Sequence, residues 1–381
     1  MSFRDLSITL TETLDKQTKQ SQGIFFTPKE ARDHIFKVLK RFRVKPTSIL
    51  EPSFGSGEFL EDIYRVYPAA TVTGVELNPT LFASSTRPNL FNQDFLEYQG
   101  QHDLIVGNPP YVVIPASPET QKCQAGRPNL FVQFLYKAVR DNLTEGGILA
   151  FVLPTSVFNC VYYELLRAYL YETTTLLAVD PLEGAYLETQ QATVALVLRK
   201  KKGRHTFFLP RAGNYYITPH YRALRALLKG STTLKALGFR VKTGDVVWNQ
   251  VKEKLADTGT LLLYSSNFST GEVILNTLTP PKKQYIQGFG RTPLSGQSIL
   301  INRGYGNTTY ALTAVVVDYP TYYAENHVNV ILPETDDART HIPAVFASLQ
   351  SPRTNDFIRM FVGNGALSKT ELEQCLPIWL D

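Results

Sequence analysis

The feature that most constrains the fold is a pair of prolines placed directly after an apolar run. Residues 103–107 (Asp-Leu-Ile-Val-Gly) read as a buried strand, and Asn108-Pro109-Pro110-Tyr111 follows it. Neither proline has an N–H to donate to a strand ladder, so the strand must end there. We therefore expect Asn108 and Tyr111 in a stiff turn at the carboxyl end of a strand. In open parallel α/β sheets, that edge is where ligands bind.

The same four residues suggest a chemistry. The Asn108 side-chain oxygen and the Pro109 carbonyl can accept the two N–H bonds of a planar amino group, and the Tyr111 ring can stack on its face. The plain alternative is a proline-rich loop with a buried tyrosine. The flanking sequence favours the first interpretation.

Strand-like and helix-like segments alternate from residue 48 to residue 198. Apolar runs predict strands at 71–75, 148–154, 175–179 and 193–198. Between them, Phe131, Phe134 and Leu135 fall on one face of a helix. The run 148–154 is apolar throughout, as in a sheet that is covered on both faces. This order predicts an α/β fold with a doubly wound parallel sheet.

Glycines and acidic residues follow the first strands of this pattern. Gly55 and Gly57 allow the backbone to turn sharply and to approach a ligand closely, although their spacing is not the dinucleotide fingerprint. Glu76 ends the second strand, a position that typically binds the two hydroxyls of a ribose. Asp94 ends a third candidate strand, where a carboxylate can accept from the exocyclic amine of an adenine-like ring.

The N-terminal segment precedes this pattern. Residues 1–22 are polar and predict a helix or an arm, and Gly23–Pro28 is an extended apolar piece ended by proline. We expect Thr27 to cap the helix that follows. That helix is predicted to be amphipathic, because its apolar residues recur at i, i+3, i+4 and i+7.

Charge is distributed unevenly along the 381 residues. Residues 1–200 carry 19 Lys+Arg and 21 Asp+Glu, whereas residues 201–381 carry 20 and 13. A basic second half suggests a polyanionic partner. Strand-like pieces at 260–264, 297–301, 310–317 and 327–332, followed by helices near 342–350, 354–362 and 368–374, predict a smaller α+β module there. We expect domains at 1–204 and 236–381, joined by a connector at 205–235.

Several classes of protein are disfavoured. The three cysteines (Cys123, Cys160 and Cys375) are scattered, which argues for a reducing, cytoplasmic location and against disulfides or a zinc site. The histidines lack metal-ligand spacing, so no metal is expected. No apolar run approaches the roughly 20 residues of a membrane span. The polar N-terminus argues against a signal peptide.

Together these segments resemble the DNA adenine-N6 methyltransferases of the gamma-type motif order, in which the cofactor and catalytic motifs precede a target-recognition domain. The resemblance extends over most of residues 23–200, and Asn108–Tyr111 matches the catalytic tetrapeptide letter for letter. It implies a Rossmann-like methyltransferase sheet and S-adenosylmethionine as the cofactor. It also implies methyl transfer to N6 of a flipped adenine in duplex DNA, within a restriction–modification system.

The resemblance also implies roles for individual residues. The implied catalytic residues are Asn108, Pro109 and Tyr111. The implied cofactor-binding residues are Phe26, Thr27, Glu51, Ser53, Gly55, Gly57, Glu76, Leu77, Asp94, Phe95, Asn108 and Pro110. The residues expected to contact DNA are Lys242, Trp248, Asn249, Lys282, Lys283, Arg291 and Arg303. Residues 192–199 contain no aromatic side chain, so the second face of the flipped base has no predicted partner there.

The expected partners are double-stranded DNA and a cognate restriction endonuclease, with no membrane, and we expect a monomer or weak dimer. A protein-glutamine methyltransferase is an alternative, because a carboxamide is also a planar NH2 group. An RNA adenine N-methyltransferase is another. Cytosine-N4 enzymes usually begin the tetrapeptide with Ser, so Asn108 favours adenine. A non-enzymatic DNA-binding module is opposed by the intact Glu51, Glu76, Asp94 and Asn108.

Overall fold

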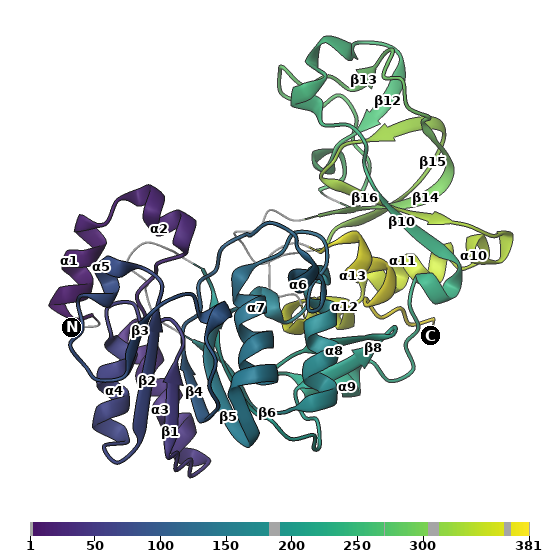
Figure 1. The fold of residues 1–381 in the computed structure, drawn as a ribbon. Coiled ribbons are helices and arrows are strands. Elements are labelled where there is room, and N and C mark those ends of the chain that lie inside the picture. Colours follow the sequence, from purple (N-terminus) through teal and green to yellow (C-terminus); the bar gives the residue numbers. More distant parts are fainter. Residues whose placement is uncertain (1–2, 183–190, 270, 304–311, 362–366, 381) are drawn as a thin grey trace. The chain divides into compact units, whose positions relative to one another are not determined.

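The computed structural model describes residues 3–182, 191–269, 271–303, 312–361 and 367–380. The chain divides into two compact units, Met1–Tyr221 and Arg222–Asp381. This division falls inside the range 205–235, where the sequence predicts a connector. Figure 1 shows the helices and strands of both units.

The first unit is built on a twisted sheet (Figure 1). Its strands, in spatial order, are β3 (Leu90–Asn92), β2 (Thr71–Glu76), β1 (Ser48–Glu51), β4 (His102–Gly107), β5 (Leu143–Pro154), β7 (Thr193–Arg199) and β6 (Thr175–Leu182). The strands from β3 to β5 are parallel to their neighbours. The strand order reverses between β1 and β4, which is a topological switch point. The expected doubly wound α/β fold is therefore confirmed.

The expectation of a wholly parallel sheet is wrong at β7. This strand runs antiparallel to both of its neighbours, β5 and β6. Only residues 183–192 join β6 to β7, and a parallel crossover needs a dozen or more residues. The connection is therefore a hairpin-like return, and β7 runs antiparallel to β6.

Helices cover both faces of this sheet. Consecutive residues of a strand point to opposite faces, so Ile49 and Leu50 of β1 belong to two separate cores. Ile49 packs with α3 (Lys29–Arg41) and α4 (Glu58–Val66), and Leu50 packs in the core that includes α7 (Leu130–Lys137) and α8 (Glu164–Thr173). The remaining elements that begin in this unit are α1 (Asp5–Thr13), α2 (Lys16–Gln22), α5 (Pro79–Phe82), α6 (Pro118–Gln121), β8 (Phe208–Arg211), β9 (Asn214–Ile217) and α9 (Tyr221–Leu227).

The second unit is an α+β fold with a mostly antiparallel sheet. Its strands, in spatial order, are β10 (Phe239–Thr243), β16 (Val328–Pro333), β14 (Leu294–Asn302), β15 (Ala314–Ala324), β12 (Thr260–Leu263), β13 (Tyr285–Ile286) and β11 (Leu255–Ala256). Its helices are α10 (Asp336–Thr340), α11 (Ile342–Gln350), α12 (Pro352–Phe361) and α13 (Lys369–Gln374). The strand expected at 310–317 is β15, which begins later; residues 310 and 311 lie outside the described residues.

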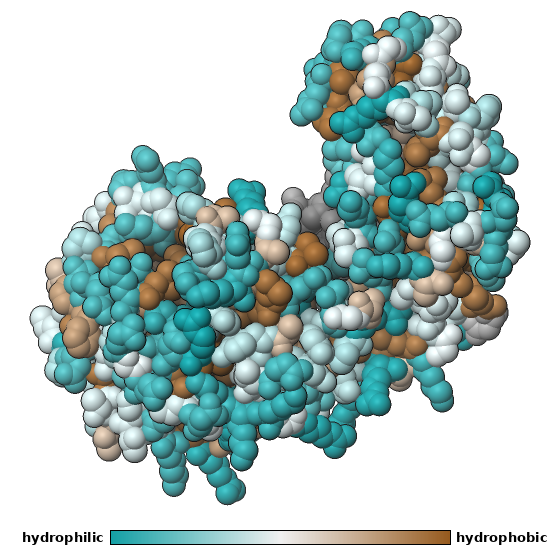
Figure 2. All heavy atoms as spheres, turned by 45° about the vertical axis from the view of Figure 1, so that its right-hand side comes forward, coloured by the Kyte–Doolittle hydropathy of each residue, from teal (hydrophilic) through white to brown (hydrophobic). Residues whose placement is uncertain are grey.

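Hydrophilic side chains cover most of the visible face of each unit (Figure 2). The apolar strand residues are buried instead, as Leu104, Ile105 and Val106 of β4 illustrate. None of the helices described here is long and apolar enough to cross a membrane.

Candidate functional site

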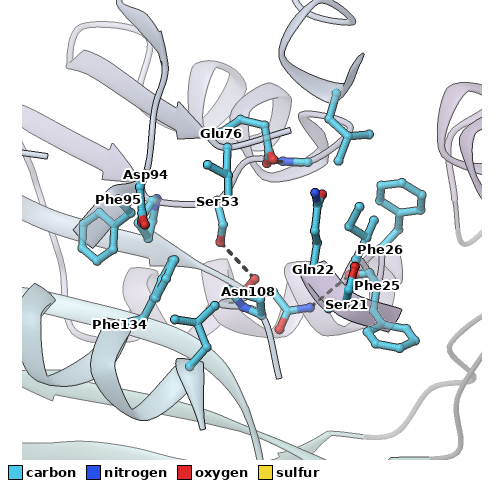
Figure 3. A pocket seen from close by; sticks show the side chains of 18 residues that line it. Ser21, Gln22, Phe25, Phe26, Ser53, Glu76, Asp94, Phe95, Asn108 and Phe134 are labelled. Atoms are coloured by element: carbon cyan, nitrogen blue, oxygen red, sulfur yellow. Dashed lines mark hydrogen bonds between the residues drawn. The ribbon is translucent and has the colours of Figure 1, made fainter. Parts of the chain in front are cut away.

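The carboxyl ends of β1, β2 and β4 meet at the switch point of the first unit. Glu51 ends β1, Glu76 ends β2 and Asn108 follows β4, while Asp94 lies just beyond β3. Figure 3 shows Glu76, Asp94 and Asn108 around one cavity. The structure thus brings these four residues to one edge of the sheet.

Glu76 is held by two backbone N–H groups. Gly55 donates to Glu76 Oε2 at 2.9 Å, and Asn78 donates to Oε1 at 2.8 Å. The side chain is buried, and this burial raises its pKa, although the two N–H bonds act in the opposite direction. Each carboxylate oxygen keeps a lone pair, so Glu76 can still accept hydrogen bonds from a ligand's hydroxyl groups.

Glu51 is a buried carboxyl group with an unsatisfied oxygen. Among the residues that the structure describes, Glu51 Oε2 has no hydrogen-bond partner. Burial raises the pKa of Glu51 well above its ordinary value, and the charge of nearby Glu76 adds to the rise. A cationic ligand group placed here would offset both effects, because an opposite charge favours the ionised form.

The glycine loop connects β1 to α4. Gly55 has a φ of 56° and Gly57 a φ of 76°, both in the left-handed region that favours glycine. Gly57 is the N-cap residue of α4. From the same loop, Ser53 Oγ donates to the Asn108 carbonyl at 3.2 Å, so this loop is bonded to the turn after β4 (Figure 3).

Asp94 and Phe95 border the other end of the cavity. Asp94 Oδ1 accepts the N–H of Leu96 at 2.8 Å, and this bond orients the carboxylate. Phe95 is buried and packs on Phe134 of α7, with ring centroids 4.7 Å apart. The cavity therefore has one carboxylate beside an apolar wall, which suits an aromatic ring that bears an amino group.

Asn108 is bonded through both ends of its amide. Its Nδ2 donates to Thr27 Oγ1 at 3.0 Å and to the Phe25 carbonyl at 3.4 Å. Its Oδ1 lies 2.6 Å from the hydroxyl of Tyr111. Pro109 is buried. The expected cap role of Thr27 is wrong: Pro28 is the N-cap residue of α3, and no side chain caps that helix.

The cavity wall includes most of the predicted cofactor residues. Those around the main cavity are Phe26, Ser53, Gly55, Glu76, Leu77, Asp94, Phe95, Asn108 and Pro110. An adjoining smaller hollow adds Thr27 and Glu51. Gly57, Pro109 and Tyr111 line neither space. Sequence reasoning gave no role in the site to Ser21, Gln22, Leu81 and Phe134, which line the main cavity. The cavity is also lined by residues that had no individual role but lie in the segments Gly23–Pro28, Glu51–Gly57 and Asn129–Phe131, which carry the resemblance: Gly23, Ile24, Phe25, Pro52 and Leu130.

One signal could have found some of the missed residues. Phe134 stood out as part of an apolar helix face, but such a face is more often core than ligand site. Gln22 carried no signal, because its position depends on how α2 packs. Gln22 Oε1 accepts from Asn78 Nδ2 at 2.8 Å, which ties α2 to the end of β2.

The predicted DNA-contacting residues all belong to the second unit, and several are paired with carboxylates. Lys242 and Arg291 both bind Asp245, at 2.6 and 3.1 Å, and Lys283 binds Asp257 at 2.9 Å. These pairs reduce the positive charge that each cation offers to a partner.

Other cations of the second unit lie on an aromatic ring. Lys282 lies 5.0 Å and Lys252 5.7 Å from the ring centroid of Trp248. We call Trp248, Lys252 and Lys282 the Trp248 cluster. Asn249, in the adjacent turn, is exposed, and Arg303 Nη1 donates to the Asn326 carbonyl at 2.9 Å.

Comparisons with known proteins agree with this geometry. Residues 75–185 match the family described as Eco57I restriction-modification methylase. The type II methyltransferase M.CvrRI of Paramecium bursaria Chlorella virus XZ-6E is 28% identical over 99% of both chains. The modification methylase CviBIII of Paramecium bursaria Chlorella virus NC1A is also 28% identical over 99% of both chains. These likenesses support a restriction–modification methyltransferase.

A shorter likeness is to a transfer RNA methyltransferase. The tRNA1(Val) (adenine(37)-N6)-methyltransferase of Bacteroides thetaiotaomicron is 37% identical over 94 residues, which is 24% of this chain and 40% of that protein. The Eco57I match begins at Val75 in β2, so it includes Glu76, Asp94 and Asn108.

Proposed function

We propose that this methyltransferase transfers a methyl group from S-adenosylmethionine to the exocyclic N6 of adenine in duplex DNA. The observation that carries the proposal is the placement of Asn108. Its Nδ2 donates to Thr27 and to the Phe25 carbonyl, which leaves Oδ1 as the acceptor end, and Asn108 lines a cavity together with Glu76 and Asp94.

The residues present fit S-adenosylmethionine. Glu51 has a buried oxygen that finds no hydrogen-bond partner in the described part of the chain, and burial raises its pKa, which suits the cationic methionine end of that molecule. Glu76 would accept from the ribose hydroxyls, and Asp94 would accept from the adenine amine of the cofactor. Phe95 and Phe134 would pack on the ring. When bound, this cofactor supplies an electrophilic methyl group on a sulfonium.

Asn108 and Pro109 would act on the target base. The nitrogen lone pair of an aromatic amine is delocalised into its ring. If Asn108 Oδ1 and the Pro109 carbonyl accept its two N–H bonds, the nitrogen becomes more tetrahedral and its lone pair becomes available for attack. Such positioning and electrostatic stabilisation contribute several kcal/mol of barrier lowering. Tyr111 would stack on the base, which must therefore leave the duplex, at a cost of a few kcal/mol.

DNA is the substrate that the comparisons favour. The two relatives that match along the whole chain are named type II methyltransferase and modification methylase. The second half of the chain, residues 201–381, holds 20 Lys+Arg against 13 Asp+Glu. We propose that the second unit reads the target, with the Trp248 cluster, Asn249, Lys283, Lys242, Arg291 and Arg303 facing the duplex. A cognate restriction endonuclease would be the functional partner.

An RNA substrate is the second candidate, because one shorter likeness is to a tRNA adenine-N6 methyltransferase. That likeness spans only 24% of this chain, whereas the two relatives named as a type II methyltransferase and a modification methylase match along 99% of it. A protein glutamine would need no large basic unit. These differences favour DNA.

The substrate class can be tested directly. The protein is incubated with methyl-labelled S-adenosylmethionine and, in separate reactions, with duplex DNA, transfer RNA or a glutamine-bearing protein substrate. We expect label in DNA alone. Label confined to RNA or to protein would reject the proposal. The Asn108→Ala variant is the matched control for non-enzymatic labelling, and it should leave cofactor binding largely intact.

A further inference from the structure

The amide of Asn108 is oriented by a segment that lies far away in sequence. Its Nδ2 donates to Thr27 Oγ1 at 3.0 Å and to the Phe25 carbonyl at 3.4 Å. A carbonyl can only accept, so Phe25 determines which end of the amide is the nitrogen. The shorter of the two bonds is the one to Thr27. Both bonds leave Oδ1 as the acceptor end of the amide, on the side away from Thr27.

Thr27 is itself fixed by its surroundings. It is 5% exposed and precedes Pro28, which restricts its backbone to extended conformations. The Thr27 carbonyl accepts a hydrogen bond from Arg32 Nη1. Arg32 is also buried, and its guanidinium pairs with Glu58 and, at 2.8 Å, with Asp62. Thr27 is therefore a rigid acceptor and not a mobile loop hydroxyl.

We infer that Thr27 is a positioning residue, which acts by holding the Asn108 amide with Oδ1 directed at the amino group of the target. The inference rests on the proposed function and adds a residue to it. The resemblance to known methyltransferases implied only a cofactor contact for Thr27, and its expected cap role is not met. Instead, the Thr27 hydroxyl accepts a hydrogen bond from Asn108, which lies in the turn that we propose to act on the target base.

Two substitutions separate this role from simple packing. Thr27→Val keeps the shape and the β-branch but removes the acceptor, whereas Thr27→Ser keeps the hydroxyl. Methyl transfer is measured in a single turnover with saturating cofactor and DNA, and cofactor affinity is measured separately. We expect Thr27→Val to slow transfer by about 10- to 100-fold, the effect of losing one buried hydrogen bond at the reacting group. Thr27→Ser should stay within about threefold, and both should bind the cofactor like the wild type.

A matched control addresses general destabilisation. Thr73 is also a buried threonine of the first unit, in β2, and Thr73→Val should leave the transfer rate nearly unchanged. Wild-type transfer rates from Thr27→Val, or a loss of cofactor affinity in place of a slower rate, would overturn the inference.

A second readout does not depend on activity. Hydrogen exchange of the Asn108 side-chain NH2 is followed by NMR with asparagine-selective ¹⁵N labelling, and the signal is assigned by its loss in Asn108→Asp. We expect slow exchange in the wild type and in Thr27→Ser, and faster exchange in Thr27→Val. Equal exchange in all three overturns the inference. If the wild type transfers no methyl group, the proposed function fails, and this readout still tests whether Thr27 holds the amide.

Discussion

The hydroxyl oxygen of Tyr111 lies 2.6 Å from Asn108 Oδ1 and 2.8 Å from the Val152 carbonyl. The Tyr111 ring meets Phe131 edge-on, with centroids 5.9 Å apart and an angle of 80° between the planes. In this conformation the hydroxyl occupies the oxygen that we assign to the amino group of the base. Because an amide oxygen has two lone pairs, the amino group of a bound base can share Asn108 Oδ1 with this hydroxyl or displace it.

The ring and the hydroxyl of Tyr111 should contribute differently. Tyr111→Phe keeps the stacking ring and frees Asn108 Oδ1, so we expect transfer within about tenfold of the wild type. Tyr111→Ala should lose roughly 1–3 kcal/mol of base stacking. Base extrusion can be followed by the fluorescence of 2-aminopurine at the target position. Equal losses in the two variants would show that the hydroxyl matters and that the ring does not stack.

Cofactor binding should depend on pH through Glu51. Burial, reinforced by Glu76, raises the pKa of Glu51 in the folded chain above its ordinary value of 4.5. A raised pKa contributes stability below the ordinary value, and this stability is lost as pH rises through the raised value. The free energy of unfolding without cofactor should therefore fall from pH 4.5 upward, and Glu51→Gln should flatten that slope.

The cofactor reverses this preference, because its positive charge favours ionised Glu51. Affinity should therefore rise with pH, and binding should release a proton. Calorimetry in buffers of different ionisation enthalpy measures that proton. Glu97→Gln, at an exposed carboxylate, is the matched control. An identical proton count for the wild type and Glu51→Gln would contradict this assignment.

Cations of the second unit should differ in their contribution to DNA binding. Lys282 and Lys252 lie on Trp248, whereas Lys242 shares Asp245 with Arg291. Removing one cation that binds a phosphate reduces the slope of log K against log salt by about 1. We expect that reduction for Lys282→Ala and a smaller one for Lys242→Ala, because Lys242 is already neutralised. Lys235→Ala, at an exposed position, serves as the control. The reverse order of the two slopes would place the duplex near Asp245 instead.

The sequence was informative where a local pattern decides the structure. β4 ends at Gly107, just before the Asn-Pro-Pro-Tyr turn, and β2 ends at Glu76. The ends of both strands could therefore be predicted from the strand pattern alone. The reversal of β7 was not predictable from the expected strands, because residues 180–192 between them are long enough for a parallel crossover, and the connection is shorter only because β6 extends to Leu182. Its apolar composition alone does not distinguish parallel from antiparallel pairing.

Contacts between distant segments could not be predicted. Thr27 and Asn108 are 81 residues apart, and only the packing of α2 and α3 brings them together. Arg291 and Asp245 are 46 residues apart. The sequence therefore carries no indication that Asp245 neutralises the charge of Arg291, a predicted DNA contact. For residues whose contacts come from distant segments, the sequence shows which chemical group is present but not which residue that group binds.

The central claim is methyl transfer to N6 of adenine by the turn at Asn108, and the most direct test identifies the methylated base. Duplex DNA is treated with the protein and S-adenosylmethionine, digested to nucleosides and analysed by mass spectrometry. We predict N6-methyldeoxyadenosine with the wild type, and a loss of at least about 100-fold with Asn108→Ala, whose cofactor affinity should be retained. N4-methyldeoxycytidine as the product, or undiminished N6-methyldeoxyadenosine from Asn108→Ala, would contradict the account.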